Sequence, residues 1–392
     1  MKVFVAHPGL QHAHQLAWGL HERSLLQEFW SGVPVFSDGE KLPSWLPTSY
    51  AQRVKKVGIP PELRRHPIVF QGLLRANSVL PPGFSREDYA HRVFHLFDWW
   101  IAKHIPRLKP KVVVAYENSA FHTFRAAKAI GARCILDAPS LHHLAGAKLM
   151  VVRPTPYLAE INRRKDEEVA LADMVLTCSP LAAEGYLDAG VAPEKVCPML
   201  LGATLPDGVG GWRPHAQPLN FIFAGALSHR KAIDVILSAF RRLYTEALPY
   251  RLSFVGGLGE PGWVQKIEET PGASYSPGVA QAALYQMLAQ ADCLLLPSRF
   301  DSFGMVVAEA MACGTPAIVS TQTGAKAMIE QFLDAGWVVA CDEDSLYKCV
   351  KEHIQNREKL FAARGYALAA SQHFTWQAYR RRVGQLIQDW MH

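Results

Sequence analysis

Short apolar runs alternate with helical patterns along most of this 392-residue chain, and this alternation is the strongest constraint on its fold. Helical patterns include Ala232–Leu243, Gln281–Gln290 and Met305–Ala312. The predicted strands are Lys2–Ala6, Lys111–Ala115, Cys134–Leu136 and Met174–Thr177 in the first half, then Leu219–Phe223, Leu252–Val255, Cys293–Leu296, Ala317–Ser320 and Trp337–Ala340. Such alternation predicts an α/β fold of parallel sheets with helices on both faces.

The pattern breaks at Pro206-Asp-Gly-Val-Gly-Gly-Trp-Arg-Pro214, which is typical of an interdomain linker. We therefore predict one Rossmann-like domain over 1–205, a linker over 206–218 and a second Rossmann-like domain over 219–372. Two doubly wound domains would face a central cleft, with ligands bound at the carboxyl ends of the strands.

Composition narrows the class of protein further. Hydrophobic residues make up 49% and charged residues 19%, as in ordinary globular proteins. No run of 18 or more apolar residues is present, and the N-terminal apolar run predicts a first strand rather than a signal peptide. The seven cysteines are dispersed without a C-x-x-C pair, and no Cys/His cluster has zinc-ligand spacing. These features predict a reducing, cytoplasmic setting.

Positive charge is concentrated in residues 51–111, which hold 12 Lys/Arg against 4 Asp/Glu within a chain of net charge +6. Arg53, Lys55 and Arg75 belong to this segment, and Phe84 and Trp99 are among its interleaved aromatics. A solvated helix face with core aromatics fits the pattern. A surface for anionic lipid head groups or a phosphorylated acceptor fits it as well. Nucleic acid is not expected, because no recognised binding motif accompanies the charge.

Two carboxylates eight residues apart, Asp301 and Glu309, carry the clearest functional signal. They flank a Ser-Phe-Gly turn that opens a predicted helix, whose first amides, around Phe303, Gly304 and Met305, suit a phosphate. Eight residues span just over two helical turns, or about 12 Å. The spacing favours a nucleotide-linked substrate over a small acid.

A second motif, Phe221-Ile-Phe-Ala-Gly225-Ala-Leu-Ser-His-Arg230-Lys231, is a strand followed by a glycine turn and a helix start. The bare Gly225 would let a ligand approach the backbone, and Lys231 could neutralise a diphosphate. Taken alone, the motif favours an ordinary surface lysine.

Two further patterns have simpler explanations. Gly257-Leu-Gly259-Glu-Pro-Gly262 matches a dinucleotide fingerprint, but it lacks the acidic residue after a following strand, so a tight turn is predicted. Asp342-Glu-Asp344 matches a metal-binding D-x-D pattern, but its place before a helix predicts capping.

Histidines follow two of the predicted strands. His7, His12 and His14 surround the first strand–helix turn, and His142 and His143 follow Cys134–Leu136. Either group could line the cleft and act in proton transfer. We name His143 as the candidate catalytic histidine, with Asp137 and Glu117 as alternatives.

From Phe221 to Gly324 the sequence resembles the nucleotide-binding domain of family 4 glycosyltransferases, retaining enzymes of the GT-B fold. The resemblance rests on the Asp301–Glu309 spacing with Glu309-Ala-Met-Ala-Cys-Gly-Thr-Pro316, on the glycine turn with Lys231, and on Leu288-Ala-Gln-Ala-Asp292. Phe374-Thr-Trp376 resembles the C-terminal segment of that family, which implies that 373–392 forms a helix crossing back to the first domain.

The resemblance implies roles for the matched residues. Glu309 would bind the donor ribose, Asp301 the donor sugar, and Lys231 the diphosphate as it leaves. Gly225, Arg230 and the amides of Phe303, Gly304 and Met305 would complete the donor site, with no metal and no further cofactor. Two positions depart from the family: Asp301 replaces the usual Glu, and Ala226 replaces a diphosphate-binding Arg.

The implied activity is transfer of a sugar from a nucleoside-diphosphate sugar to a hydroxyl of a glycan or lipid-linked glycan. We expect this activity to serve cell-surface polysaccharide biosynthesis. We expect the protein in the cytoplasm, at an anionic membrane surface. A nucleotide-sugar epimerase and a non-catalytic partner of an active transferase are the alternatives.

Overall fold

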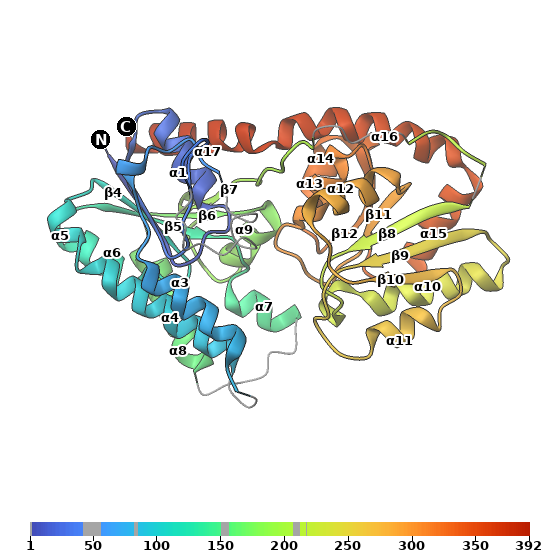
Figure 1. Cartoon of the computed structure of the whole chain (residues 1–392), viewed down its shortest axis with the longest axis horizontal. Coiled ribbons are helices and arrows are strands. Elements are labelled where there is room, and N and C mark those ends of the chain that lie inside the picture. Colours follow the sequence, from blue (N-terminus) through green and yellow to red (C-terminus); the bar gives the residue numbers. More distant parts are fainter. Residues whose placement is uncertain (1, 42–55, 82–84, 150–156, 207–211, 217) are drawn as a thin grey trace.

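The computed structural model describes residues 2–41, 56–81, 85–149, 157–206, 212–216 and 218–392. Arg53, Lys55, Phe84 and the glycines of the predicted linker lie outside these residues. Two α/β domains stand side by side, each built on one parallel sheet, and the chain ends meet on the first domain (Figure 1). The predicted fold class is confirmed.

The first domain contains a seven-stranded parallel sheet in the order β3-β2-β1-β4-β5-β6-β7. The strands are β1 (Val3–His7), β2 (Leu26–Ser31), β3 (Arg64–Arg65), β4 (Val112–Tyr116), β5 (Arg133–Ala138), β6 (Met174–Thr177) and β7 (Val196–Pro198). The helices are α1 (Ala13–Glu22), α3 (Ile68–Ala76), α4 (Arg86–Ala102), α5 (Ile105–Leu108), α6 (Phe121–Ala129), α7 (His143–Leu149), α8 (Leu158–Leu171) and α9 (Pro180–Leu187).

The second domain contains a six-stranded parallel sheet in the order β10-β9-β8-β11-β12-β13. Its strands are β8 (Leu219–Ala224), β9 (Tyr250–Val255), β10 (Ala273–Ser276), β11 (Cys293–Leu296), β12 (Ala317–Ser320) and β13 (Gly336–Val339). Its helices are α10 (Ile233–Thr245), α11 (Trp263–Glu268), α12 (Gln281–Gln290), α13 (Met305–Ala312), α14 (Lys326–Gln331), α15 (Glu343–Gln355) and α16 (Arg357–Ser371).

Alternation of side chains along the first-domain strands explains its layers. Val3 and Val5 face a core with α1, whereas Phe4 and Ala6 face a second core with α4 and α6. Successive strand residues point to opposite faces, so apolar residues at every position require helices on both sides. The short, uniformly apolar β11, Cys293-Leu-Leu-Leu296, is buried on both faces in the same way.

The last helix, α17 (Trp376–Met391), returns to the first domain and lies along α1 (Figure 1). Small residues allow this close approach: a Cβ added to Gly19 would lie 2.6 Å from the carbonyl oxygen of Arg380. Beside the linker, Ala203 N–H donates to the Phe374 oxygen at 2.7 Å. The chain therefore crosses between the domains twice, at adjacent points.

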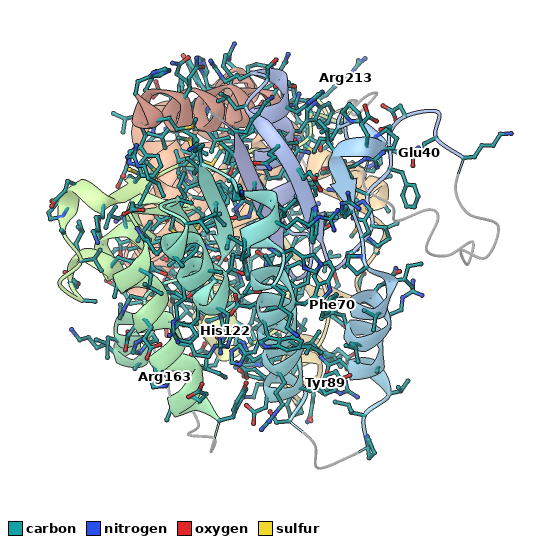
Figure 2. The ribbon with its side chains drawn as sticks, turned by 90° about the vertical axis from the view of Figure 1, so that its left-hand side faces the viewer. Glu40, Phe70, Tyr89, His122, Arg163 and Arg213 are labelled. Carbon is teal, nitrogen blue, oxygen red and sulfur yellow. The ribbon has the colours of Figure 1, made fainter. Side chains whose placement is uncertain are left out.

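The basic segment shows how its aromatics are used. Phe70 and Phe97 are buried, with ring centroids 5.0 Å apart, and the helices that carry Phe70 and Tyr89, α3 and α4, lie next to each other (Figure 2). Ile68 and Val69 on α3 are 60% and 61% exposed, and Trp99 on α4 is 46% exposed. Most of the aromatic pattern is therefore core, with a small apolar surface left beside it.

One of the simpler predictions is confirmed by geometry. Asp342 caps α15, since its carboxylate accepts the Ser345 N–H at 2.8 Å. All seven cysteines are free. Within the part of the chain that the structure describes, no helix is both long and apolar enough to cross a bilayer.

The fully buried His353 should make stability depend on pH. Its ring lies 4.0 Å from the Trp337 ring, and burial lowers the pKa of His353 to about 4. Between pH 6.5 and 4 the His353 imidazole is protonated in the unfolded chain but stays neutral in the folded chain. Because of this residue, the free energy of unfolding should therefore fall by about 1 kcal/mol for each pH unit below 6.5.

Urea unfolding at pH 7 and pH 5 tests this dependence. The free energy of unfolding should fall less between the two pH values in His353→Gln than in the wild type. The exposed His373→Gln variant is the control, and an equal loss in all three proteins would contradict the prediction.

Candidate active site

One cavity of about 940 Å³ lies between the two domains, at the carboxyl ends of both sheets. Its first-domain wall includes residues at or after the ends of β1, β4, β5, β6 and β7, and its second-domain wall includes residues at or after the ends of β8, β9, β10 and β11. Open parallel sheets bind ligands at this edge, because the loops there diverge and leave a crevice. The cavity is therefore the candidate active site.

Two predicted site residues from distant parts of the second domain meet in this cavity. Lys231 ends a short 3₁₀ turn (His229–Lys231) after β8, and its ammonium contacts the carboxylate of Asp301. Both side chains are nearly buried, at 12% and 13% exposure. The backbone of Asp301 is fixed on both sides, since its N–H donates to the Gln322 oxygen at 3.0 Å and its oxygen accepts the Gly324 N–H at 2.8 Å. The site thus holds a paired cation and anion in one place.

Glycine backbone forms the floor beside this pair. A Cβ on Gly256 would lie 1.9 Å from the carbonyl oxygen of Gly225, so no other residue fits there without backbone movement. Gly225 itself has φ +152° and faces open space except for the ring of Phe223 at 3.5 Å. The floor is bare where Gly225, Gly256 and Gly257 line the cavity, and a ligand can reach the backbone.

The N-terminus of α13 points into the same cavity. Gly304, with φ +90°, precedes the helix, and the first helical hydrogen bond is donated by the Val307 N–H to the Gly304 oxygen. The amides of Met305 and Val306 precede that bond at the positive end of the helix dipole. Phe303 is buried beneath them, at 3% exposure. This arrangement favours an anionic ligand group.

Glu309 and Arg230 also line the cavity. Gln281 donates from Nε2 to Glu309 Oε1 at 3.2 Å, which orients the carboxylate from α12. The Arg230 guanidinium donates to the Phe300 oxygen at 2.9 Å, directly before Asp301. Ala226 is exposed at the cavity edge. Arg230 therefore stays at the site, although a backbone carbonyl holds one of its donors.

The first-domain wall presents a histidine that our catalytic assignment did not select. His12, in the turn after β1, places Nε2 2.9 Å from Oδ1 of Asp137 at the end of β5, and both side chains are buried. Tyr116 and His14 line the cavity beside it. The sequence signal for the His12–Asp137 pair is that each residue follows the carboxyl end of a predicted strand. The carboxyl ends of β1 and β5 lie at the same edge of the sheet, so these residues can meet.

The structure does not bring His143 to the cavity. After β5 the chain lines the cavity with Pro139 and Ser140, and α7 then carries His143 to a position beside α8. There His143 Nε2 lies 2.6 Å from Asp166 Oδ1. The expected position of His143 in the cavity is therefore wrong, and His12 is the histidine that lies there together with His14. The strand-end argument holds for only two or three residues past β5.

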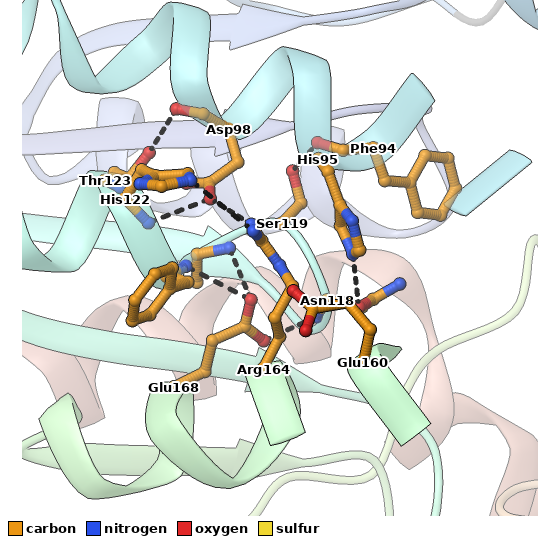
Figure 3. A network of polar contacts seen from close by, with 12 residues as sticks. Phe94, His95, Asp98, Asn118, Ser119, His122, Thr123, Glu160, Arg164 and Glu168 are labelled. Carbon is orange, nitrogen blue, oxygen red and sulfur yellow. Dashed lines mark hydrogen bonds and ion pairs between the residues drawn. The ribbon is translucent and has the colours of Figure 1, made fainter. Parts of the chain in front are cut away.

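A buried polar network supports this wall from behind (Figure 3). Glu168 accepts the N–H groups of Asn118 at 2.6 Å and Ala120 at 2.9 Å, and Asp98 accepts the Thr123 N–H at 2.8 Å and a 2.7 Å bond from Arg164. Burial raises the pKa of Glu168 to about 8, while the amide donors favour its carboxylate. The network holds the β4–α6 loop.

That loop carries Glu117, whose carboxylate accepts the hydroxyl of the cavity residue Ser140. Lys165 pairs with Glu117 at 2.8 Å. The buried network is thereby connected to the cavity wall through one carboxylate.

A direct contact joins the two domains next to the cavity. The Ser302 carbonyl accepts the Ser179 hydroxyl, and the Cys178 thiol lies 3.3 Å from the same oxygen and 3.0 Å from the Pro139 oxygen, to one of which it donates. Burial raises the pKa of Cys178 to about 12, so the thiol stays protonated and can donate. A Cβ on Gly324 would lie 2.1 Å from the Ser302 oxygen. We call this contact the Ser302 bridge; an apolar cluster of Leu141, Leu181 and Phe300 lies beside it.

Comparison with known proteins agrees with this geometry. The family model described as "Glycosyl transferases group 1" matches residues 218–356. The D-inositol 3-phosphate glycosyltransferase of Streptosporangium roseum is 25% identical over 274 residues, which cover 63% of this chain and 62% of that protein. Across relatives with this name the chain spans about half their length, between 36% and 62%.

Solved structures match over the whole chain. HepE of Anabaena in complex with UDP-glucose has a TM-score of 0.65 at 14% identity and covers 99% of this chain and 100% of its own. Sucrose-phosphate synthase from Thermosynechococcus elongatus has a TM-score of 0.63 at 16% identity, covering 100% and 99%. At such identities these likenesses establish the fold alone. Residues 218–356 form a domain of the glycosyl transferases group 1 family, and the chain that carries it has the GT-B fold.

Proposed function

We propose that this chain is a retaining glycosyltransferase that moves a sugar from a nucleoside-diphosphate sugar to a hydroxyl of a glycan or lipid-linked glycan. The observation that carries this is the convergence of Lys231, Asp301, the glycine floor and the α13 N-terminus on one cavity. Its volume of about 940 Å³ is at the upper end of ligand pockets, which run from about 300 to 1,000 Å³. The Anabaena protein of the same fold was solved with UDP-glucose, which supports this class of donor.

In this proposal each cavity residue has one task. The diphosphate rests on the glycine floor and the first amides of α13, and Lys231 exchanges part of its contact with Asp301 for a phosphate oxygen. Glu309 accepts the ribose hydroxyls, and Asp301 turns to the sugar. The positive charge of Lys231 and of the helix end stabilises the departing diphosphate, so no metal takes part at the donor site.

The transfer step needs no enzyme nucleophile in this scheme. The bond between the anomeric carbon and the phosphate oxygen breaks, and the acceptor oxygen bonds to the same carbon from the same face. The acceptor proton passes to the departing phosphate oxygen. Entry and departure on one face retain the anomeric configuration. His12, oriented by Asp137, hydrogen-bonds the sugar or the acceptor from the opposite wall.

A donor screen tests the proposal. UDP-, GDP- and ADP-sugars are compared by thermal shift; a donor at 100 times its Kd should stabilise the protein by about 2.7 kcal/mol. The stabilising donor is then incubated with glycan and lipid-linked acceptors, and the product anomer is determined by NMR. Transfer with retention is expected. Conversion of the donor sugar without an acceptor would instead identify an epimerase, and binding without turnover would identify a non-catalytic partner.

We also propose that the enzyme works at an anionic membrane face in cell-surface polysaccharide biosynthesis. The exposed Ile68 and Val69, with Arg75 at the end of the same helix, support this, because such a helix can insert apolar side chains among lipid head groups. Cosedimentation with liposomes should rise with anionic lipid content and fall with salt. Binding that depends on neither would contradict it.

A further inference from the structure

Two adjacent histidines and one aspartate meet on the first domain, outside the cavity. His142 precedes α7, His143 begins it, and Asp166 projects from α8. Oδ1 of Asp166 lies 2.6 Å from His143 Nε2 and 3.4 Å from His142 Nε2, and the three atoms all lie within 4.8 Å of one another. Residues 24 positions apart in sequence thereby present three donor atoms around one point.

The spacing of these atoms is close to that of a metal site. Zinc binds imidazole nitrogen at about 2.0–2.1 Å and carboxylate oxygen at about 2.0–2.2 Å, so tetrahedral ligands stand about 3.3–3.4 Å apart. The His142–Asp166 separation already has this value, and the His143–Asp166 hydrogen bond would open by less than 1 Å. We propose that His142, His143 and Asp166 bind one divalent transition-metal ion, for which Zn²⁺ is the best match.

Positive charge near the three ligands is compensated, so it does not oppose a bound cation. The nearby Lys165 is paired with Glu117 at 2.8 Å, so its charge is compensated. His142 Nδ1 accepts only a long contact from the Leu144 N–H, at 3.4 Å. A metal on Nε2 would place the ring proton on Nδ1 and release that contact at little cost.

Exposure gives the ion a way in. His142 and His143 are 6% and 14% exposed, whereas Asp166 is 54% exposed. Three protein ligands leave at least one position for water, as in open zinc sites. The bound ion would tie α7 to α8. Because Leu141 and Ala145, which flank the histidines, pack with Phe300 of the second domain, the same ion would also stiffen the wall of the cavity.

Zinc titration of the metal-stripped, full-length protein tests the site. Isothermal titration calorimetry with Zn²⁺ should give one site per chain, and His143→Gln or Asp166→Asn should weaken it by at least about 10- to 100-fold. Glu167→Gln is the matched control, since it neutralises the next carboxylate of α8, which pairs with Arg163. That variant should bind as the wild type does.

X-ray absorption of the zinc-loaded wild type supplies a measurement that needs no variant. It should show two imidazoles at about 2.0–2.1 Å together with oxygen ligands. No uptake of Zn²⁺ by the wild type, uptake unchanged in both ligand variants, or a sulfur-rich zinc environment would each overturn the proposal.

Discussion

Replacing Lys231 with alanine should lower kcat for sugar transfer by about 10²- to 10³-fold, the usual cost of removing one group that stabilises developing negative charge. Lys231 lies on the cavity wall beside the glycine floor and the α13 N-terminus, where a diphosphate would leave. Its charge matters most when the sugar–phosphate bond breaks, so kcat should fall more than KM rises.

The contact between Lys231 and Asp301 adds a second, more specific expectation. Without Lys231, the Asp301 carboxylate would face the incoming diphosphate at only 13% exposure, with no cation in contact. Like charges in a partly desolvated site repel strongly. The double variant Lys231→Ala/Asp301→Asn should therefore bind donor more tightly than Lys231→Ala alone.

Steady-state kinetics and calorimetry of the four proteins form a double-mutant cycle. Lys348→Ala is the control, because that lysine is exposed and pairs with Asp344 on α15. Wild-type activity in Lys231→Ala would refute the assignment. Strictly additive effects on donor affinity would show that the ion pair is unrelated to donor binding.

Replacing Glu309 with alanine should raise the KM for the donor by about 10- to 100-fold, with a smaller effect on kcat. A carboxylate that accepts the ribose hydroxyls makes charge-assisted hydrogen bonds, each contributing about 1.5–3 kcal/mol. The ribose does not change during transfer, so these bonds are equally strong in the ground and transition states. The proposed roles therefore predict that Lys231→Ala mainly lowers kcat, whereas Glu309→Ala mainly raises the KM for the donor.

The Glu309 experiment has an internal check. Gln281→Ala removes the side chain that orients Glu309 at 3.2 Å and should give a weaker effect of the same kind. Glu330→Ala, an exposed carboxylate on α14, should leave both constants unchanged. A Glu309→Ala enzyme that loses kcat and keeps its KM would show that this carboxylate acts on the reacting sugar instead.

Strands with continuous apolar runs could be predicted from the sequence to within two residues, as Met174–Thr177, Cys293–Leu296 and Ala317–Ser320 show. β2, β3, β7 and β10 escaped prediction. The polar Gln27 and Glu28 interrupt β2, β10 is a short edge strand with serines, and β3 has two residues. In these strands tertiary pairing, rather than local preference, determines the structure.

Some features of the candidate site could likewise be predicted from local sequence, whereas others depend on tertiary structure. Local spacing located Glu309, Gly304 and Lys231 in the wall of one cavity, because each follows a recognisable strand. The Lys231–Asp301 contact joins residues 70 positions apart, which no local pattern encodes. The pairing of His12 with Asp137 depends in turn on how β1 and β5 flank β4.

The Ser302 bridge has a consequence for turnover. The carbonyl that accepts the Ser179 hydroxyl belongs to the residue directly after Asp301, so the loop proposed to contact the donor also joins the two domains. If the cleft opens to release the nucleoside diphosphate, this contact has to break. It would form again when the next donor binds and the cleft closes. Release of the nucleoside diphosphate and loss of the contact that holds this loop would then occur together. Ser179→Ala, which leaves every cavity side chain in place, would change how long the nucleoside diphosphate stays bound.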